Sequence, residues 1–303
     1  MTRFYKLYGL LVESEIEFVE AEEVTATSES DAVIRLGLPP EWVIREYKEE
    51  GKFSSLSDQC AWFRVYEEIL IYVENGRNAV VWVLNESMSK EYLNTYVLSG
   101  VFTFLMFQRG YVVIHGSALE YKGGVFVVSG PSGSGKSTTA AELLKDDSFR
   151  FASDDLSAIR VIDGKCILFP GPPWQKLLPD AHARQEDSDD GEYVFLDECG
   201  GKFAKRLRSG YINEPTELKH IFYISKEDRD LLKIEEVKGS DALNLLTHNL
   251  FRGEIISTLG VSPEKLMNYL AIVSSVKIYD IERPKGKDTL SELTGKIKEI
   301  VCG

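Results

Sequence analysis

Alternating apolar and polar positions, rich in aromatic and β-branched residues, dominate the first part of the chain. Such runs are typical of β-strands, because successive side chains of a strand point to opposite faces. Asn75-Gly76 separates two of the runs and suits a tight hairpin turn with positive φ angles. We therefore expect residues 1–86 to form a small, antiparallel, β-rich domain. The strand-like runs are residues 3–12, 31–37, 61–73 and 79–84.

A continuous apolar stretch follows, and its flanking residues predict a helix at 87–109. Ser89 is a good N-cap, and Gly110 is suited to end the helix. The most apolar part, residues 96–107, is shorter than the roughly 20 residues that span a bilayer. We therefore expect a buried helix that connects two domains, and no membrane partner.

Strand-like and helical runs alternate in residues 110–303. Two strand-like runs meet at Lys122-Gly123-Gly124, and the second leads through a glycine-rich loop into the helical run 136–145. Another hairpin signal, Asp163-Gly164, follows too soon for a second helix to intervene. A purely parallel sheet would need that helix, so we expect an α/β domain with a mixed sheet. Later strands are expected at 220–225 and 275–281, with a helical pair at 242–260.

Composition narrows the classes of function. The 303 residues carry a formal net charge of −13, which argues against a general nucleic-acid-binding protein. The four cysteines are scattered and form no CxxC pair, so the sequence indicates neither a zinc site nor a disulfide framework. No secretion signal is evident at the N-terminus. We expect a cytoplasmic protein without a nucleic-acid partner.

Residues 130–137, GPSGSGKS, match the GxxxxGK[ST] pattern of a P-loop between a strand and a helix. Glycines let the backbone wrap around a phosphate, and the following helix offers unbonded N–H groups. Lys136 would contact the β- and γ-phosphates, and the Ser137 hydroxyl would ligate Mg²⁺. The sequence therefore predicts a site for ATP and Mg²⁺. The expected nucleotide-binding residues are Gly130, Ser132, Gly133, Ser134, Gly135, Lys136, Ser137 and Thr138.

Candidate catalytic residues flank this loop in the sequence. Asp154 and Asp155 follow an apolar strand, where one carboxylate could bind Mg²⁺ and the other could accept the proton of an attacking hydroxyl. Because adjacent side chains on a strand point to opposite faces, we expect the two to have different roles. His115 ends the strand before the loop, and a structural and a catalytic role are equally open for it. The chain has neither the NKxD motif of GTPases nor an LSGGQ segment after the loop, which argues against switch and transport ATPases.

The segment VIHGSALEYKGGVFVVSGPSGSGKS, followed by Asp154-Asp155, resembles the HPr kinase/phosphorylase family over residues 110–165. The resemblance implies a P-loop kinase domain with a mixed sheet, like that of phosphoenolpyruvate carboxykinase. In this chain that domain would follow the small β-rich N-terminal domain. The chain departs from the family at Thr138, where an acidic residue is usual, and in the absence of the family's glycine-rich C-terminal signature.

A closer resemblance, over almost the whole chain, is to the HPr-kinase-like precursor kinases of lasso-peptide gene clusters. It depends on the same motifs and on PGPPWQKLLPDA at residues 170–181. It implies transfer of the ATP γ-phosphoryl group to a serine-type hydroxyl, typically on the C-terminal residue of a ribosomally made precursor peptide. It also implies phosphate and metal contacts for Lys136 and Ser137, and a catalytic cluster of His115 with the two aspartates.

Within this cluster we expect Asp154 to act as the base and Asp155 to bind the metal, with the reverse order open. A peptide carboxylate or a transferring phosphoryl group also needs cationic contacts. Lys205 and Arg206 rank first for this role, because they belong to a basic cluster in an acidic chain. The full set of candidates is Lys176, Lys205, Arg206 and Arg252.

The sequence leaves other functions open. The chain could be a kinase for another protein or for a small hydroxylated metabolite. It could also be a nucleotide-sensing binding protein without transferase activity, although pure binding does not require a general base. The choice between ATP and other nucleotide donors and the formation of a homo-oligomer are open as well.

Overall fold

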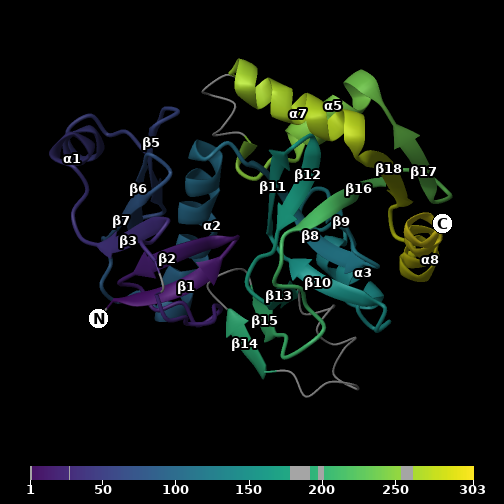
Figure 1. Cartoon of the computed structure of the whole chain (residues 1–303), viewed down its shortest axis with the longest axis horizontal. Coiled ribbons are helices and arrows are strands. Elements are labelled where there is room, and N and C mark those ends of the chain that lie inside the picture. The colour runs from purple at the N-terminus through teal and green to yellow at the C-terminus, as the bar shows by residue number, and fades with distance from the viewer. Residues whose placement is uncertain (1, 27, 178–191, 197–200, 254–261) are drawn as a thin grey trace. The chain divides into compact units, whose positions relative to one another are not determined.

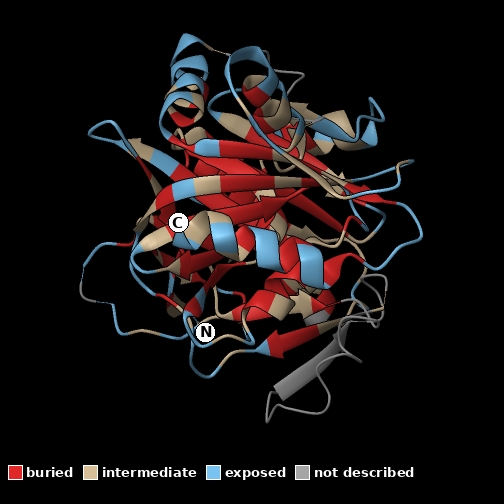
Figure 2. Cartoon of the chain, turned by 90° about the vertical axis from the view of Figure 1, so that its right-hand side faces the viewer, coloured by how far each residue is buried: buried red, intermediate tan, exposed pale blue. Residues whose placement is uncertain are grey.

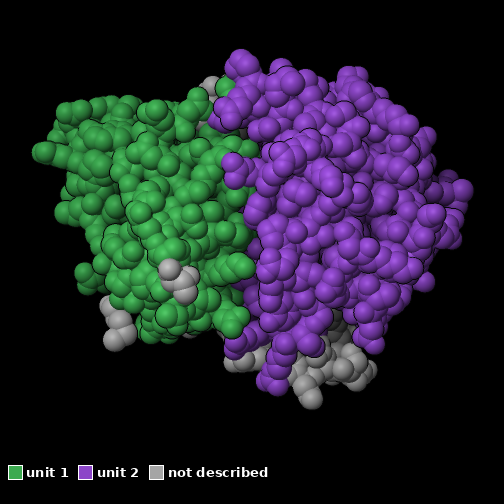
Figure 3. All heavy atoms as spheres, in the orientation of Figure 1, with its two compact units in different colours: residues 1–111, 254–262 green, residues 112–253, 263–303 purple. Residues whose placement is uncertain are grey.

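The computed structural model describes residues 2–26, 28–177, 192–196, 201–253 and 262–303. Contacts divide the chain into two compact units, which Figure 3 colours separately. Unit 1 contains residues 1–111, and unit 2 contains residues 112–253 and 263–303. The helix expected at 87–109 lies within unit 1.

Within its described residues, unit 1 is built on a seven-stranded sheet. Its strands and first helix are β1 (Arg3–Leu7), β2 (Leu10–Ser14), β3 (Ala32–Leu36), α1 (Glu41–Lys48), β4 (Ser54–Leu56), β5 (Cys60–Val65), β6 (Ile69–Glu74) and β7 (Asn78–Val83). The predicted hairpin at Asn75-Gly76 is confirmed, with positive φ at both residues. However, β3 pairs parallel to both β2 and β7, so the expectation of a purely antiparallel domain is wrong. Long connections on both sides of β3 make these parallel pairings possible, whereas tight hairpins would not.

Helix α2 (Lys90–Gln108) packs on this sheet against β5 and β6. The Ser89 hydroxyl accepts a hydrogen bond from the backbone N–H of Tyr92 at 3.1 Å, which confirms the predicted N-cap. Residues 101–107 are all buried, as their apolar sequence predicted. None of the helices in the described part of the chain is both long enough and apolar enough to cross a membrane.

Unit 2 is built on a large mixed sheet. Its elements are β8 (Val112–Tyr121), β9 (Gly124–Ser129), α3 (Lys136–Leu143), β10 (Phe149–Ser153), β11 (Leu156–Ile162), β12 (Lys165–Phe169), β16 (Thr216–Glu227), β17 (Lys233–Val237), α5 (Gly239–His248), α7 (Pro263–Ser275), β18 (Lys277–Pro284) and α8 (Leu290–Cys302). Strands β9 and β18 both pair parallel to β16, whereas β8, β10, β11, β12 and β17 make antiparallel pairs. The predicted mixed sheet is therefore confirmed. A separate small sheet contains β13 (Trp174–Leu177), β14 (Glu192–Leu196) and β15 (Lys202–Arg206).

Two pairs of helices cover opposite faces of the large sheet (Figure 1). Val125 and Val127 of β9 pack in a core with residues of α5 and α7, whereas Phe126 and Val128 pack in a core with residues of α3 and α8. This alternation follows the two-residue period of a strand. Figure 2 shows the buried strands between the helices and the exposed outer face of α8. The loop from β9 to α3 consequently begins at the edge where the parallel strands end.

Candidate functional site

The loop 130–135 joins β9 to α3 and contains three glycines with positive φ. At Gly130, φ is 140° and an added Cβ would lie 2.1 Å from the carbonyl oxygen of Ile224, so a larger residue does not fit. The Lys136 ammonium donates hydrogen bonds to the carbonyl oxygens of Gly130 at 2.8 Å and Pro131 at 3.1 Å. The lysine thus folds back over the loop at the N-terminus of α3. Such an arrangement suits an anion.

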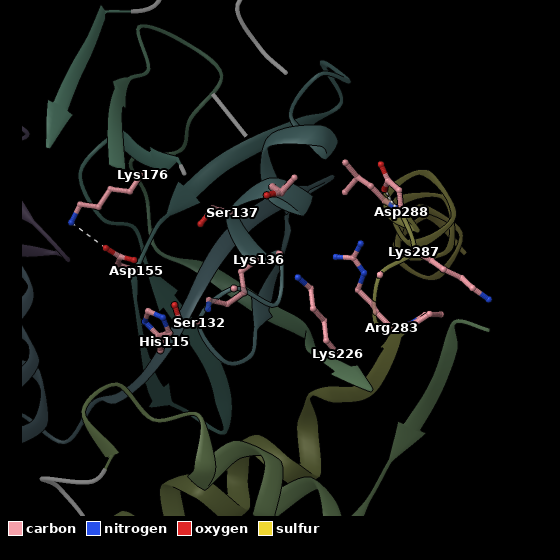
Figure 4. Close-up of a pocket in the computed structure, with 16 residues that line it drawn as sticks. His115, Ser132, Lys136, Ser137, Asp155, Lys176, Lys226, Arg283, Lys287 and Asp288 are labelled. Carbon is pink, nitrogen blue, oxygen red and sulfur yellow. Dashed lines mark hydrogen bonds and ion pairs between the residues drawn. The ribbon is translucent and has the colours of Figure 1, made fainter. Parts of the chain in front are cut away.

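This loop forms one wall of a pocket of about 410 Å³ (Figure 4). Five of the lining residues are lysine or arginine and two are aspartate, in a chain whose net charge is −13. A local excess of cations in an acidic protein favours an anionic ligand. The lining residues are His115, Ser132, Gly133, Gly135, Lys136, Ser137, Thr138, Asp155, Lys176, Lys226, Arg283, Pro284, Gly286, Lys287, Asp288 and Leu290.

Two of these cations come from the ends of parallel strands and were missed in the sequence. Lys226 of β16 and Arg283 of β18 are partners in the parallel register. Because β16 also pairs parallel with β9, both residues lie at the sheet edge where the glycine-rich loop begins. Figure 4 shows both side chains extending toward Lys136. The signal that could have found them is their position just after two predicted strands, because residues that follow parallel strands converge at one edge.

Arg283 also joins the loop to the segment that follows β18. It is only 8% exposed, and its Nη1 donates a hydrogen bond to the carbonyl oxygen of Ser134 at 3.1 Å. Its Nε donates to the hydroxyl of Thr289 at 2.9 Å. An added Cβ on Gly135 would lie 2.5 Å from Nη1, so the glycine allows this close approach. Because a buried guanidinium needs its hydrogen bonds, Arg283 fixes the loop against the segment 284–290.

Asp154 and Asp155 occupy a break between β10 and β11. Both strands pair with β8, and Leu156, directly after the break, lies opposite His115. Asp155 has φ 62°, a left-handed conformation that aspartate tolerates better than most residues. This irregular backbone places two adjacent carboxylates in different surroundings, next to the strand that carries His115.

Asp154 does not line the pocket. Its Oδ1 accepts a hydrogen bond from the Ser117 hydroxyl at 2.5 Å, and its Oδ2 accepts one from the backbone N–H of Lys176 at 2.8 Å. The residue as a whole is partly buried, but burial of its carboxyl group raises the pKa to about 6, and the charge of Asp155 adds to this. Asp154 is thus hydrogen-bonded to Ser117 and to the backbone of Lys176 and is not among the pocket-lining residues, so a role as the base stays a prediction from the sequence.

Asp155 does line the pocket, together with His115 and Lys176. The Lys176 Nζ lies 3.1 Å from Oδ2 of Asp155, and the lysine side chain is 11% exposed. The backbone N–H of His115 donates to the carbonyl oxygen of Asn249 at 2.9 Å, and its ring packs against Phe251. One end of the pocket therefore presents a carboxylate, an imidazole and an ammonium group (Figure 4).

The structure brings most, but not all, of the predicted site residues together. Gly130 and Ser134 do not line the pocket, although they shape the loop. Lys205 is buried on β15, where burial lowers its pKa, and Arg206 is exposed; neither of them nor Arg252 lines the pocket. Lys205 and Arg206, which ranked first for contact with the acceptor, therefore lie outside the lining of this pocket. The predicted residues that do line the pocket are His115, Ser132, Gly133, Gly135, Lys136, Ser137, Thr138, Asp155 and Lys176.

A site for Mg²⁺ can be tested on the donors that line this pocket. Among the described residues, no group of three or more His, Cys, Asp or Glu could hold a metal ion. A nucleotide-bound Mg²⁺ requires less, because one or two protein oxygens, phosphates and water complete its shell. The Ser137 hydroxyl and the Asp155 carboxylate both line the pocket, so the donors present fit such an ion.

Comparisons with known proteins add one structural likeness. No family model matches the chain, and no curated protein matches it in sequence. The structure of the Hpr(Ser) kinase/phosphatase from Coxiella burnetii is similar over 63% of this chain and 90% of that chain. The sequence identity is 10% and the TM-score is 0.31. Since such a loose superposition identifies no site, the functional conclusion depends on the residues of this pocket.

Proposed function

We propose that the protein is an ATP-dependent kinase that transfers the γ-phosphoryl group to a hydroxyl of its substrate. One observation carries the proposal: a single cationic pocket gathers Lys136 and Ser137 of the glycine-rich loop with Asp155 and His115. The loop suits the phosphates of a nucleotide, and a carboxylate beside it can accept a hydroxyl proton. A protein that only binds nucleotide would not need this carboxylate and imidazole.

The phosphates of the donor would lie along the glycine-rich loop. On binding, the Lys136 ammonium would exchange its hydrogen bonds with loop carbonyls for bonds with phosphate oxygens. Lys226 and Arg283 would face the same phosphates from the strand ends. The Ser137 hydroxyl would hold Mg²⁺, which, when bound, neutralises charge on the β- and γ-phosphates.

Asp155 takes the base role in this proposal, because it is the aspartate that lines the pocket. Its carboxylate accepts the proton as the acceptor oxygen bonds to the γ-phosphorus, and the bond from that phosphorus to the β-phosphate oxygen breaks to release ADP. Lys176, 3.1 Å from Asp155, is placed to meet the transferring group as well. Asp154 positions this assembly, since it binds the backbone N–H of Lys176.

We propose as acceptor the C-terminal serine-type residue of a ribosomally made precursor peptide of the lasso type. The support is the sequence resemblance, together with the surplus of cations in the pocket, which suits a peptide that ends in a carboxylate. Kinases for another protein or for a small hydroxylated metabolite are the alternatives that the test must separate.

The test is a phosphorylation assay with labelled Mg·ATP and an acceptor panel. Peptides that end in serine are compared with the same peptides ending in alanine or with an amidated C-terminus, and with hydroxylated small molecules. We expect product from the free-acid serine peptides alone, and none with Lys136→Ala. Lys145→Ala is the matched control, because Lys145 follows the same helix and pairs with Glu142 outside the pocket. Nucleotide binding without product on any acceptor would contradict the proposed kinase.

A further inference from the structure

One wall of the pocket has no role in the reaction described above. It is the segment 284–290, between the end of β18 and the start of α8. This segment is far in sequence from both the glycine-rich loop and the aspartates, yet it supplies almost a third of the pocket lining. Its lining residues are Pro284, Gly286, Lys287, Asp288 and Leu290.

The order of residues along the pocket places this wall relative to the reaction. Figure 4 shows Asp155 and His115 at one end, Lys136 in the middle, and Lys287 and Asp288 at the other end. A nucleoside triphosphate is a linear molecule whose nucleoside is joined to the phosphate farthest from the one transferred. When the γ-phosphate lies beside Asp155, the nucleoside therefore points toward the segment 284–290.

We propose that the segment 284–290 is the nucleoside subsite of the phosphoryl donor, an inference that rests on the proposed kinase function. Pro284 and Leu290 are buried apart from the surface that they give to the pocket, so they offer an apolar contact to a base. At Gly286 an added Cβ would meet no atom within 4 Å, so the space beside this glycine is open. The Asp288 carboxylate, fixed by a hydrogen bond from the backbone N–H of Leu290 at 3.0 Å, is an acceptor that suits a ribose hydroxyl.

This subsite is held in place before any ligand binds. Arg283 connects the carbonyl oxygen of Ser134 in the glycine-rich loop to the Thr289 hydroxyl at the start of α8. The phosphate wall and the nucleoside wall are thus fixed to each other by one buried guanidinium. A preformed pocket of this kind avoids the cost of ordering its walls when the donor binds.

Three glycines of unit 2 provide a matched test. Gly133, Gly164 and Gly286 have φ of 76°, 76° and 75°, and an added Cβ on any of them would meet no atom within 4 Å. Gly133 lies in the phosphate wall, Gly286 in the proposed nucleoside wall, and Gly164 in the β11–β12 hairpin outside the pocket. Asparagine tolerates this left-handed conformation, so Gly→Asn adds a side chain at equal backbone cost in all three places.

The experiment measures binding of two probes by calorimetry in the presence of Mg²⁺: ATP and inorganic tripolyphosphate, which lacks the nucleoside. We expect Gly286→Asn to weaken ATP binding by about tenfold or more, and to leave tripolyphosphate binding unchanged within about twofold. Gly133→Asn should weaken both probes, and Gly164→Asn neither. Thermal unfolding of each variant confirms that it is folded.

Two results would overturn the subsite. The first is an unchanged affinity for ATP in Gly286→Asn, even if this substitution raises the KM for the acceptor. That result would mean that the nucleoside binds elsewhere. The second is an equal loss of affinity for ATP and for tripolyphosphate in Gly286→Asn. That result would mean that the segment 284–290 contacts the phosphates and not the nucleoside. Failure of the wild-type protein to bind either probe would instead reject the proposed function itself, so the two failures are distinguishable.

Discussion

The glycine-rich loop and the break at Asp154-Asp155 both leave regular structure through positive φ angles, but they use opposite kinds of residue. In the loop, the carbonyl oxygen of Ile224 leaves no space for a side chain at Gly130. At the break, Asp155 adopts φ 62° and keeps a side chain that lines the pocket. Both regions therefore need a left-handed backbone, but position 130 requires a residue without a side chain and position 155 requires a carboxylate.

The difference follows from which part of the chain meets the ligand. At the loop a phosphate would meet backbone N–H groups, and glycine is required at position 130 because the backbone turns there directly against the carbonyl oxygen of Ile224. At the break the carboxylate itself is the reactive group, and aspartate adopts the left-handed conformation at low cost. Substitutions at the break should accordingly affect chemistry first, whereas substitutions at the buried loop glycine should affect stability first.

The largest expected effect is on turnover at the break. Asp155→Asn keeps the left-handed preference but removes the base, so we expect kcat to fall by about a hundredfold or more with ATP binding retained. Asp154→Asn should lower kcat less than about tenfold, because the amide can donate to the Ser117 oxygen and accept from the Lys176 N–H. Steady-state kinetics with the phosphorylated acceptor as readout decide between them. If Asp154→Asn lowers kcat more than Asp155→Asn does, Asp154 is the base.

The next effect is on stability at the loop. Gly130→Ala forces a Cβ to within 2.1 Å of a backbone oxygen, so we expect the free energy of unfolding to fall by about 3 kcal/mol. Gly133→Ala has the open space described above and should lose only about 1 kcal/mol, from its left-handed backbone. Denaturant unfolding of both variants measures the difference. Equal losses of stability in the two variants would show that contact with the Ile224 oxygen is not the reason why position 130 requires glycine.

These two regions also show how far the sequence could lead. The pattern GPSGSGKS lies in one continuous segment, so it predicted the loop, and the strand before it and helix after it are confirmed. Asp154 and Asp155 were also identified from the sequence, because they are adjacent residues at the end of one predicted strand. Their roles could not be assigned, because the break between β10 and β11 is a tertiary feature that depends on pairing with β8.

The opposite wall of the pocket could not be predicted in this way. Lys226 and Arg283 are ordinary basic residues in sequence, and only the parallel register of β16 and β18 brings them beside the loop. Lys205 and Arg206 illustrate the converse. They cluster in sequence, but β15 carries them into a different sheet, where neither reaches the pocket. Local sequence therefore identified the wall made from one segment and missed the wall assembled from strand ends.

A smaller effect is expected on how the free energy of unfolding depends on pH, and it concerns Asp154. The Asp154 pKa is raised from 3.8 to about 6 by burial and by the charge of Asp155. Between these values the folded protein binds a proton at Asp154 that the unfolded chain releases, so this residue makes folding less favourable as pH rises from about 4 to 6. Asp154→Asn lacks the titrating group. Relative to the wild type, we expect this variant to gain about 2 kcal/mol of stability across that range.

Unfolding by denaturant at several pH values checks this prediction, with the difference between Asp154→Asn and wild type as the measured quantity. Other titrating groups largely cancel in that difference. A difference that is flat between pH 4 and 6, or that changes in the opposite direction, would show that Asp154 is ionised in the folded protein throughout this range.

The smallest expected effect isolates the backbone at the break. Asp155→Ala and Asp155→Asn both remove the ion pair with Lys176, but only asparagine tolerates φ 62° well. We therefore expect Asp155→Ala to be less stable than Asp155→Asn by about 1 kcal/mol in denaturant unfolding. The same two substitutions at Asp241, in the first turn of α5, provide the control, because there alanine is the better helix former and the order should reverse. Equal stability of the two variants at 155 would mean that the break places no conformational demand on its residue, and the parallel between the break and the glycine-rich loop would then be lost.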